Sequence, residues 1–214
     1  SERRLRARLR ELPDGVFRAV DYIDHDGHEN RLYRFSVELT KEDDRLTFDY
    51  SGCPPQAPGF INCTESGLHG GVFTALLPIL AYDIPWNEGL KRPLSIVAPP
   101  GTICNATPPA PTGSATIAAA WVVANVAVRA LSLLMGCSDR YRRESQACSS
   151  GAFSVLNLAG LNQYGEAFGA MILDPMASGE GAYFLRDGAD AHGCFMIPVP
   201  NIANVETNEN FAPL

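Results

Sequence analysis

The sequence predicts an α+β fold in which an antiparallel β-meander and further hairpins pack on a few helices. Apolar and polar residues alternate through residues 17–23, 31–40 and 46–50, which is the period of strands with one buried face. Residues 114–135 are instead apolar almost all round, as in a long buried helix. The short polar segments between the alternating stretches favour antiparallel neighbours.

The first twelve residues predict an amphipathic helix. Leu5, Leu9 and Leu12 recur at helical spacing, and arginines occupy most of the other positions. A solvated arginine face is the expected arrangement, although the same face could seat an acidic partner or phosphates. A Pro-Asp-Gly turn at residues 13–15 should end the helix.

The stretch at residues 46–62 carries the first candidate functional residues. A strand is followed by a loop that Pro54, Pro55 and Pro58 stiffen, since proline fixes φ and lacks the N–H that a ladder requires. Such a strand would present Asp49 beside a cleft, and the loop would end at Asn62. An ordinary strand with a crossover loop explains the same pattern, so both interpretations stay open.

Residues 24–30 join the first two predicted strands and contain His25 and His28 among carboxylates. These residue types are metal ligands in other proteins, which gives the hypothesis of a small metal-binding module. A polar loop centred on glycine is also what a hairpin tip contains, and we expect the hairpin.

Further elements follow in order. Residues 68–82 predict a helix that Pro78 should kink or break, and residues 94–98 predict a short strand. The long helix at residues 114–135 contains Asn125 and Arg129, which we expect to be satisfied by internal partners, so a membrane span is not expected. Residues 154–158 and 167–173 predict a last strand pair, and a sub-boundary is expected near residue 112 or 138.

Composition limits the classes of partner and compartment. The 214 residues carry a net charge of −7, so no basic field is available for nucleic acid or an anionic membrane. The six cysteines show no CxxC pair, which favours reduced thiols and a cytoplasmic location.

Three later segments add polar candidates. Asn87 and Glu88 share a turn, and the loop at residues 186–192 brings Asp187 close to His192. Asn204 and Glu206 supply an amide and a carboxylate near the end of the sequence. A carboxylate beside an imidazole can activate water, although an Asx-type turn has the same composition.

Six stretches resemble, in the same order, the B-type subunit of the hydantoinase and oxoprolinase family, which also includes subunits of acetone and acetophenone carboxylases. They are residues 1–15, 49–62 (DYSGCPPQAPGFIN), 84–89 (IPWNEG), 92–110 (RPLSIVAPPGTICNATPPA), 186–192 (RDGADAH) and 200–206 (PNIANVE). Proteins of this family are longer, so residues 1–214 would form a central part of such a subunit.

The resemblance implies an enzyme in a multi-subunit complex. A hydantoinase A-like partner subunit would bind ATP and phosphorylate a carbonyl or amide oxygen of a small-molecule substrate. The B-type subunit would then complete carboxylation or hydrolysis. The family's divalent-metal ligands are expected before residue 1, so no metal ligand is assigned to this chain.

Two differences between this sequence and hydantoinase-type members indicate its branch within the family. Many hydantoinase-type members have Asn, Glu and a Thr-Ser-Gln run after the proline-rich loop, where this chain has GSATI at residues 113–117. The ending PNIANVETNENFAP is also closer to the ketone-carboxylase branch. A subunit of an ATP-dependent ketone carboxylase is therefore the first hypothesis, and an ATP-dependent amidohydrolase subunit is the alternative.

The resemblance and the residue types together give one predicted site. Its catalytic residues are His192, Glu88, Asp187 and Asp49, and its substrate-binding residues are Asn62, Asn87, Asn204 and Glu206. His192 or Glu88 would transfer a proton, and the asparagines would donate to a developing oxyanion. The competing hypothesis is a scaffold domain of the complex, in which these side chains do not share a cleft.

Overall fold

The computed structural model describes residues 1–148, 156–172 and 179–190. The chain divides into two compact units. The first comprises Ser1–Cys148 with Ala182–Arg186, and the second comprises Ser149–Gly181 with Asp187–Leu214.

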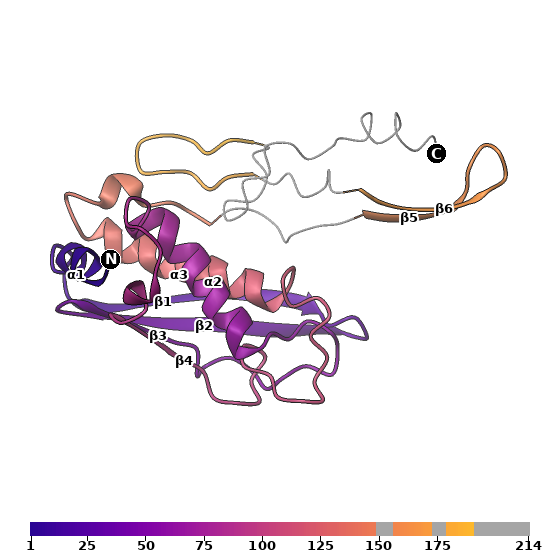
Figure 1. The fold of residues 1–214 in the computed structure, drawn as a ribbon, viewed down its shortest axis with the longest axis horizontal. Coiled ribbons are helices and arrows are strands. Elements are labelled where there is room, and N and C mark those ends of the chain that lie inside the picture. Colours follow the sequence, from indigo (N-terminus) through magenta and orange to yellow (C-terminus); the bar gives the residue numbers. More distant parts are fainter. Residues whose placement is uncertain (149–155, 173–178, 191–214) are drawn as a thin grey trace. The chain divides into compact units, whose positions relative to one another are not determined.

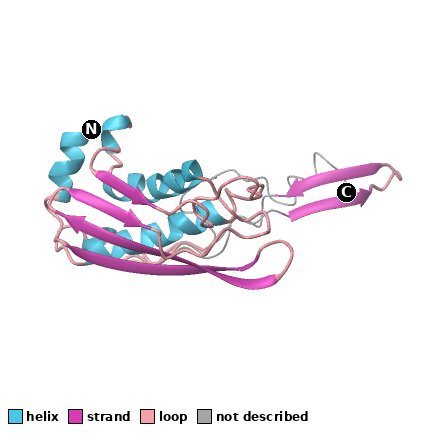
Figure 2. Ribbon diagram, turned by 90° about the horizontal axis from the view of Figure 1, so that it is seen from below, coloured by secondary structure: helices cyan, strands magenta, loops and turns pink. Residues whose placement is uncertain are grey.

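A four-stranded sheet forms the base of the first unit (Figure 1). Its order is β1 (Gly15–His25), β2 (Asn30–Glu42), β3 (Arg45–Asp49) and β4 (Leu94–Val97). The antiparallel meander predicted for the first three strands is confirmed. The fourth strand pairs parallel to β3, because the long segment between them crosses over the sheet and returns in the same direction. Figure 2 shows the long β1–β2 ribbon beside the shorter β3 and β4.

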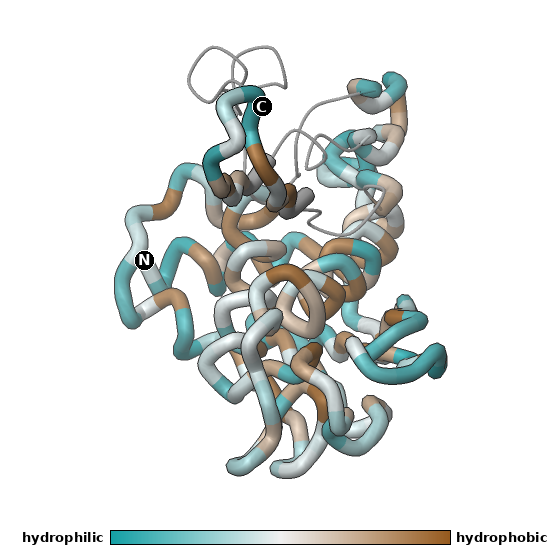
Figure 3. Tube along the Cα trace, turned by 90° about the vertical axis from the view of Figure 1, so that its right-hand side faces the viewer, coloured by the Kyte–Doolittle hydropathy of each residue, from teal (hydrophilic) through white to brown (hydrophobic). Residues whose placement is uncertain are grey.

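One face of the sheet makes the core. Phe35, Leu39, Leu46 and Phe48 are fully buried on this face, whereas the alternate residues of the same strands face the other side. Helix α3 (Ala119–Gly136) packs on β1 and β2 and against α2 (Glu65–Leu80). Both helices therefore lie on one side of the sheet, and in Figure 3 the apolar colours gather along these interior segments.

The predicted long helix is confirmed, with a later start. Residues 114–118 form turns, and α3 begins at Ala119. By length and composition α3 could cross a membrane, but 78% of its apolar window is buried within the protein, as in a core helix. Asn125 is buried, as expected. Arg129 is exposed, and it has an internal partner as expected, because it donates to the carbonyl of Val20 (3.2 Å).

Two other helical predictions need adjustment. Helix α2 continues through Pro78 to Leu80, where a kink or break was expected. At the N-terminus, α1 (Glu2–Leu9) buries Leu5 and Leu9 completely, as predicted. Two single turns, η1 (Glu88–Leu90) and η2 (Arg142–Glu144), complete the first unit.

The described part of the second unit contains a hairpin, in addition to residues 179–181 and 187–190. Strands β5 (Leu156–Leu161) and β6 (Ala167–Ile172) pair antiparallel, which confirms the predicted strand pair within the described residues. The side chain of Asn162 accepts hydrogen bonds from the backbone N–H groups of Tyr164 and Glu166 and so closes the turn.

Candidate functional site

A hollow opens on the sheet face opposite the helices, around the end of β3. It has a volume of about 280 Å³, and its polar lining comes from β1, β2 and the end of β3. We call it the Asp49 hollow and define it by Arg18, Arg34, Ser36, Glu38, Asp49 and Gly52. Asp49 lies directly opposite Glu38 in the β2–β3 register, so two carboxylates stand side by side on this face.

The charged side chains of the Asp49 hollow differ in whether they have a partner within the chain. Arg18 forms an ion pair with Glu38 (2.7 Å), and the carboxylate of Asp49 accepts a hydrogen bond from the backbone N–H of Ser51 (2.7 Å). The side chain of Arg34 is exposed, and its guanidinium forms no hydrogen bond or ion pair with any residue that the structure describes. The hollow thus offers a guanidinium that is open to an anionic ligand, close to an oriented carboxylate.

The loop after Asp49 is held by Asn62, which is fully buried. Its Oδ1 accepts from the N–H of Ala57 (2.6 Å), and its Nδ2 lies 2.9 Å from each of the carbonyls of Ala57, Gly59 and Pro111. Every one of these partners is backbone. The structure therefore shows Asn62 joining two proline-rich loops, and its predicted contact with a substrate stays a prediction.

Residues 54–56 of the stiff loop predicted from the prolines pair with residues 101–103. Gln56 donates to the carbonyl of Gly101 (2.9 Å), and Ile103 donates to that of Pro54 (3.0 Å). Pro55 and Thr102 form an antiparallel bridge between these two bonds. These contacts form an isolated antiparallel bridge, which follows the turn at the end of β3 and holds the loop against residues 101–103.

The β1–β2 turn is organised by a buried carboxylate. Asp26 accepts from the N–H groups of His28 (2.8 Å) and Glu29 (2.9 Å) and from the hydroxyl of Tyr33 (2.9 Å). The Glu29 and His28 hydrogen bonds hold the pKa of Asp26 far below its ordinary value. This turn packs on the proline-rich loop so closely that a side chain at Gly59 would meet the carbonyl of Asp26.

The metal-module hypothesis finds no support in this turn. Nδ1 of His25 accepts from the N–H of Gly27 (2.8 Å), as in a hairpin tip. Across the described residues, no group of three or more His, Cys, Asp and Glu side chains could hold a metal ion. The expectation that metal ligands precede residue 1 stays a prediction.

Asn87 and Glu88 lie at the other end of the sheet. Oδ1 of Asn87 caps η1 by accepting from Gly89, and Nδ2 donates to the hydroxyl of Ser1 (2.7 Å). The Glu88 side chain is 80% exposed and forms an ion pair with Lys91 (2.9 Å). The structure therefore does not bring Glu88 and Asp49 together, and the expected convergence on one cleft is not found for this pair.

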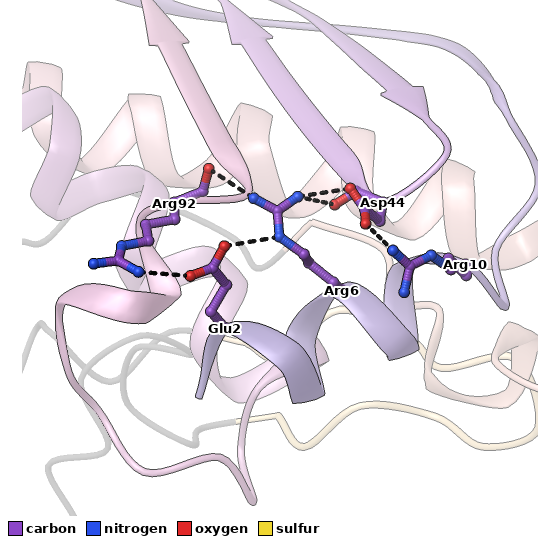
Figure 4. Close-up of polar contacts among 5 residues, drawn as sticks. All are labelled: Glu2, Arg6, Arg10, Asp44 and Arg92. Carbon is purple, nitrogen blue, oxygen red and sulfur yellow. Dashed lines mark hydrogen bonds and ion pairs between the residues drawn. The ribbon is translucent and has the colours of Figure 1, made fainter.

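The arginines of α1 are engaged with carboxylates of the same chain (Figure 4), where a solvated face was expected. Arg6 bonds to Glu2 (3.0 Å) and Asp44 (2.6 Å), and Arg10 also contacts Asp44. Arg92 completes the network by bonding to Glu2 (3.0 Å). The arginines therefore fasten α1 to the β2–β3 turn and to the segment before β4.

A second pair of α1 contacts centres on Asp83. Arg8 and Arg4 both form ion pairs with this carboxylate. Hydrogen bonding from Arg8 lowers the pKa of Asp83 to about 2. Because Arg4, Arg6 and Arg8 are all paired with carboxylates of the same chain, they do not form an open anion site. Their role in α1 is therefore structural.

Four predicted residues lie at or beyond the end of the described chain. Asp187 belongs to the second unit and is exposed, as is Asp190. His192, Asn204 and Glu206 lie outside the described residues. Their predicted catalytic and binding roles stay predictions.

A groove that was not predicted from the sequence runs along the second half of α3. It has a volume of about 570 Å³, and its lining includes Arg129, Leu133, Cys148 and Phe184. Burial raises the pKa of Cys148, so its thiol stays protonated at neutral pH. A helix pattern cannot reveal such a groove, because the opposite wall comes from residues 182–184, far along the chain.

Comparison with known proteins decides the family. The model of the Hydantoinase B/oxoprolinase family matches residues 1–214. This chain belongs to the hydantoinase B/oxoprolinase family. The match covers all six stretches on which the resemblance was based, so that resemblance is confirmed.

Two relatives and one solved structure are similar to this chain. The chain is 30% identical to the caprolactamase subunit beta of Pseudomonas jessenii, over 91% of this chain and 33% of the relative. It is 26% identical to the acetophenone carboxylase delta subunit of Aromatoleum aromaticum, over 96% of this chain and 30% of the relative. A nucleotide-free acetone carboxylase structure has the same fold, with a TM-score of 0.82, 20% identity and coverage of 98% of this chain and 29% of that one.

By their names, the two relatives are subunits of a caprolactamase and of an acetophenone carboxylase, so they support a subunit of an enzyme complex as the general kind of function. The chain spans about a third of the length of the relatives that it matches.

Proposed function

We propose that this chain is part of the catalytic subunit of an ATP-dependent enzyme that acts on a small carbonyl compound whose oxygen a partner subunit has phosphorylated. The observation that carries the proposal is the family match over all 214 residues. The first candidate reaction is carboxylation of a ketone. The partner is a hydantoinase A-like ATP-binding subunit, within a hetero-oligomer.

The Asp49 hollow is the part of the described chain that suits this chemistry. A phosphorylated substrate and bicarbonate are both anions, and the open guanidinium of Arg34 can bind either through paired N–H donors. Asp49 is oriented by the N–H of Ser51 and can exchange a proton with a bound substrate. The catalytic roles of His192 and Asp187 and the substrate-binding roles of Asn204 and Glu206 remain part of the proposal, independently of the Asp49 hollow.

ATP and a divalent metal ion would supply phosphorylation and charge neutralisation. The described residues form no metal-binding cluster, so no step is assigned to the metal on this part of the chain. What this chain contributes is the anion-binding surface, the carboxylate and the rigid loop that holds both.

Hydrolysis of a lactam is the second candidate function. It is favoured by the 30% identity to the caprolactamase subunit. Ketone carboxylation is favoured by the segment GSATI at residues 113–117, which replaces the polar run of hydantoinase-type members, and by the similarity to the acetophenone carboxylase subunit.

The test is an assay of the full-length protein reconstituted with its ATP-binding partner. The complex is given ATP and labelled bicarbonate with acetone or acetophenone, and in parallel ATP with caprolactam or 5-oxoproline. The proposal expects ketone-dependent incorporation of label together with ATP consumption. ATP-dependent ring opening without label incorporation would select the lactam hydrolase, and no ATP-dependent turnover of either class would contradict an enzyme of this kind.

A further inference from the structure

The groove beside α3 combines an apolar lining with one charged side chain among the described residues that line it. Its floor is the face of α3 that carries Arg129, Ser132 and Leu133, and its walls are residues 145–148 and 182–184. We call it the α3 groove. Its volume of about 570 Å³ is in the range of sites that enclose small organic molecules. The Asp49 hollow has a different lining, on the sheet face opposite the helices, so the two sites are separate.

Hydrogen bonds hold both walls of the α3 groove. The hydroxyl of Ser145 donates to the carbonyl of Ser132 (3.1 Å), and the N–H of Gln146 donates to the hydroxyl of Ser132 (3.2 Å). The second wall is attached to the first, because the N–H of Ala147 donates to the carbonyl of Ala182 (2.8 Å). The groove is therefore a preformed feature of the first unit, as is usual for small-molecule sites.

The exposed apolar side chains of the groove lie toward the C-terminal end of α3. Leu133 is 48% exposed and Phe184 is 54% exposed, and both line the groove. The guanidinium of Arg142, which begins η2 shortly after α3, lies over the ring of Phe184 at 5.4 Å from its centroid and helps to hold the ring in place. An apolar ligand body in the groove would remove both side chains from water, which favours binding.

Arg129 gives the other end of the groove a positive charge. One of its N–H groups donates to the carbonyl of Val20 (3.2 Å), and it forms no ion pair with a carboxylate in the part of the chain that the structure describes. A guanidinium has five N–H donors, so others stay available to a ligand. The described lining contains no carboxylate, although the chain as a whole has a net charge of −7. Charge complementarity therefore favours an anionic ligand at this end.

Cys148 is the other reactive side chain near Arg129. Burial raises the pKa of this thiol, and the guanidinium of Arg129 opposes the rise. Asp21 on β1 also acts on the thiol, but it neither lines the groove nor pairs with Arg129. Because the half-buried Cys148 is part of the wall, a ligand bound at Arg129 would cover it.

We propose that the α3 groove binds a small organic acid, with its carboxylate on Arg129 and its apolar body against Leu133 and Phe184. A carboxylate is planar and carries one charge, so its two oxygens match the N–H fork of a single guanidinium. Leu133 follows Arg129 by one helical turn, about 6 Å, which a short carbon chain can span. The inference uses none of the residues of the proposed reaction site and does not depend on the proposed function.

The test measures how added acids affect alkylation of Cys148 in the full-length protein. Iodoacetamide is added at about pH 8.5, where cysteine thiols begin to ionise, and labelling of each cysteine is followed by mass spectrometry of its peptide. Three probes are compared: octanoate, octanamide, which has the same body without the charge, and inorganic phosphate, which has charge without the body.

Saturating octanoate is expected to slow alkylation of Cys148 by about fivefold or more, because only the unliganded protein reacts, and to leave the exposed Cys137 unchanged. Octanamide and phosphate should need concentrations at least about tenfold higher for the same protection, since each lacks one half of the interaction. Failure of octanoate to protect Cys148, or equal protection by octanamide or by phosphate, would overturn the proposal.

Two exposed arginines give a matched pair of variants. Arg129→Gln should raise the octanoate concentration that halves the alkylation rate by about tenfold or more, whereas Arg143→Gln, outside the groove, should leave it unchanged. The half-effect concentration is compared because Arg129→Gln also changes the unprotected rate. An unchanged concentration in Arg129→Gln would contradict the site, and the probe comparison on the unmodified protein stands even if that variant folds poorly.

Discussion

Asp49 and Glu88 lie at opposite ends of the parallel strand pair β3–β4. Asp49 pairs with Val97 at one end, and Leu46 pairs with Leu94 at the other, about 10 Å away at the usual rise per residue. Glu88 precedes β4 and lies past the Leu94 end of the strand pair, beside α1. Helix α1 is in turn bound to Asp44 in the β2–β3 turn. One small substrate cannot touch both carboxylates, so the two predicted catalytic residues belong to different places on the sheet.

This separation gives a first prediction. Glu88→Gln should change turnover of the reconstituted complex by less than about twofold, because Glu88 is solvated and paired with Lys91. Its effect is measured as kcat under saturating ATP. A loss of about 100-fold, the size expected for a general acid or base, would instead place the reaction beside η1.

Asn62 should be among the most sensitive positions for stability. Asn62→Ala removes a buried amide and leaves the N–H of Ala57 and several carbonyls without a partner, so the free energy of unfolding should fall by about 3 kcal/mol or more. Denaturant unfolding measures the loss. Asn105→Ala, which removes one bond to Ala98, is the matched control and should cost about 1 kcal/mol. Equal effects would contradict the role of Asn62 in joining the loops.

Tyr50 links the sheet to α3 through a buried hydroxyl, which donates to the carbonyl of Val123 (3.1 Å). Tyr50→Phe should therefore lower the free energy of unfolding by about 1 kcal/mol near neutral pH.

Tyr50 should also make the free energy of unfolding depend on pH in the alkaline range. Burial raises the pKa of Tyr50 in the folded chain, so the folded state binds more protons than the unfolded state above about pH 10, and stability falls as pH rises there. Tyr50→Phe should remove this part of the alkaline loss, whereas the exposed Tyr82→Phe should keep it. Identical profiles for the three proteins between pH 9 and about 11 would refute the assignment.

Asp26 should make the β1–β2 turn sensitive to acid. Its pKa is lowered in the folded chain by the N–H groups of Glu29 and His28, so its stabilising contribution is present above about pH 4 and is lost as pH falls further. Hydrogen exchange at the Glu29 amide should accelerate in that window, relative to its intrinsic rate. Asp26→Asn should abolish the pH dependence, and Asp24→Asn, at an exposed neighbour, should leave it unchanged.

Arg129 should contribute little to stability. It is exposed and bonds to one carbonyl on the edge strand β1, so Arg129→Leu should lower the free energy of unfolding by about 1 kcal/mol or less. Chemical denaturation of Arg129→Leu beside Arg143→Leu, another exposed arginine, provides the comparison. A loss of several kcal/mol would mean that Arg129 is held in a buried ion pair after all.

Much of the fold could be predicted from periodicity. The alternation of β1 to β3, the leucine spacing of α1 and the apolar run of α3 each report burial of one face or of a whole helix, and each is confirmed. The parallel pairing of β4 could not be predicted, because four residues carry no information on strand direction. The start of α3 was also missed, since residues 114–118 continue the small and apolar pattern of the helix but form turns.

The candidate site was harder to predict because side-chain role depends on tertiary contacts. Asp49 and the stiff loop were found from local pattern, and both lie at a hollow. Arg18 and Arg34 were missed, since alternate polar residues on a strand look like an ordinary solvated face. A period-two pattern combined with the β1–β2 and β2–β3 registers would have placed both arginines on the same face as Asp49.

The most direct test of the account is turnover by Asp49→Asn in the full-length protein assembled with its ATP-binding partner. Thr47→Ser, two residues earlier on the same face of β3, is the matched control. We predict that Asp49→Asn lowers kcat by about 100-fold or more, with assembly unchanged and Thr47→Ser near normal. Full turnover by Asp49→Asn would contradict a catalytic role for the Asp49 hollow.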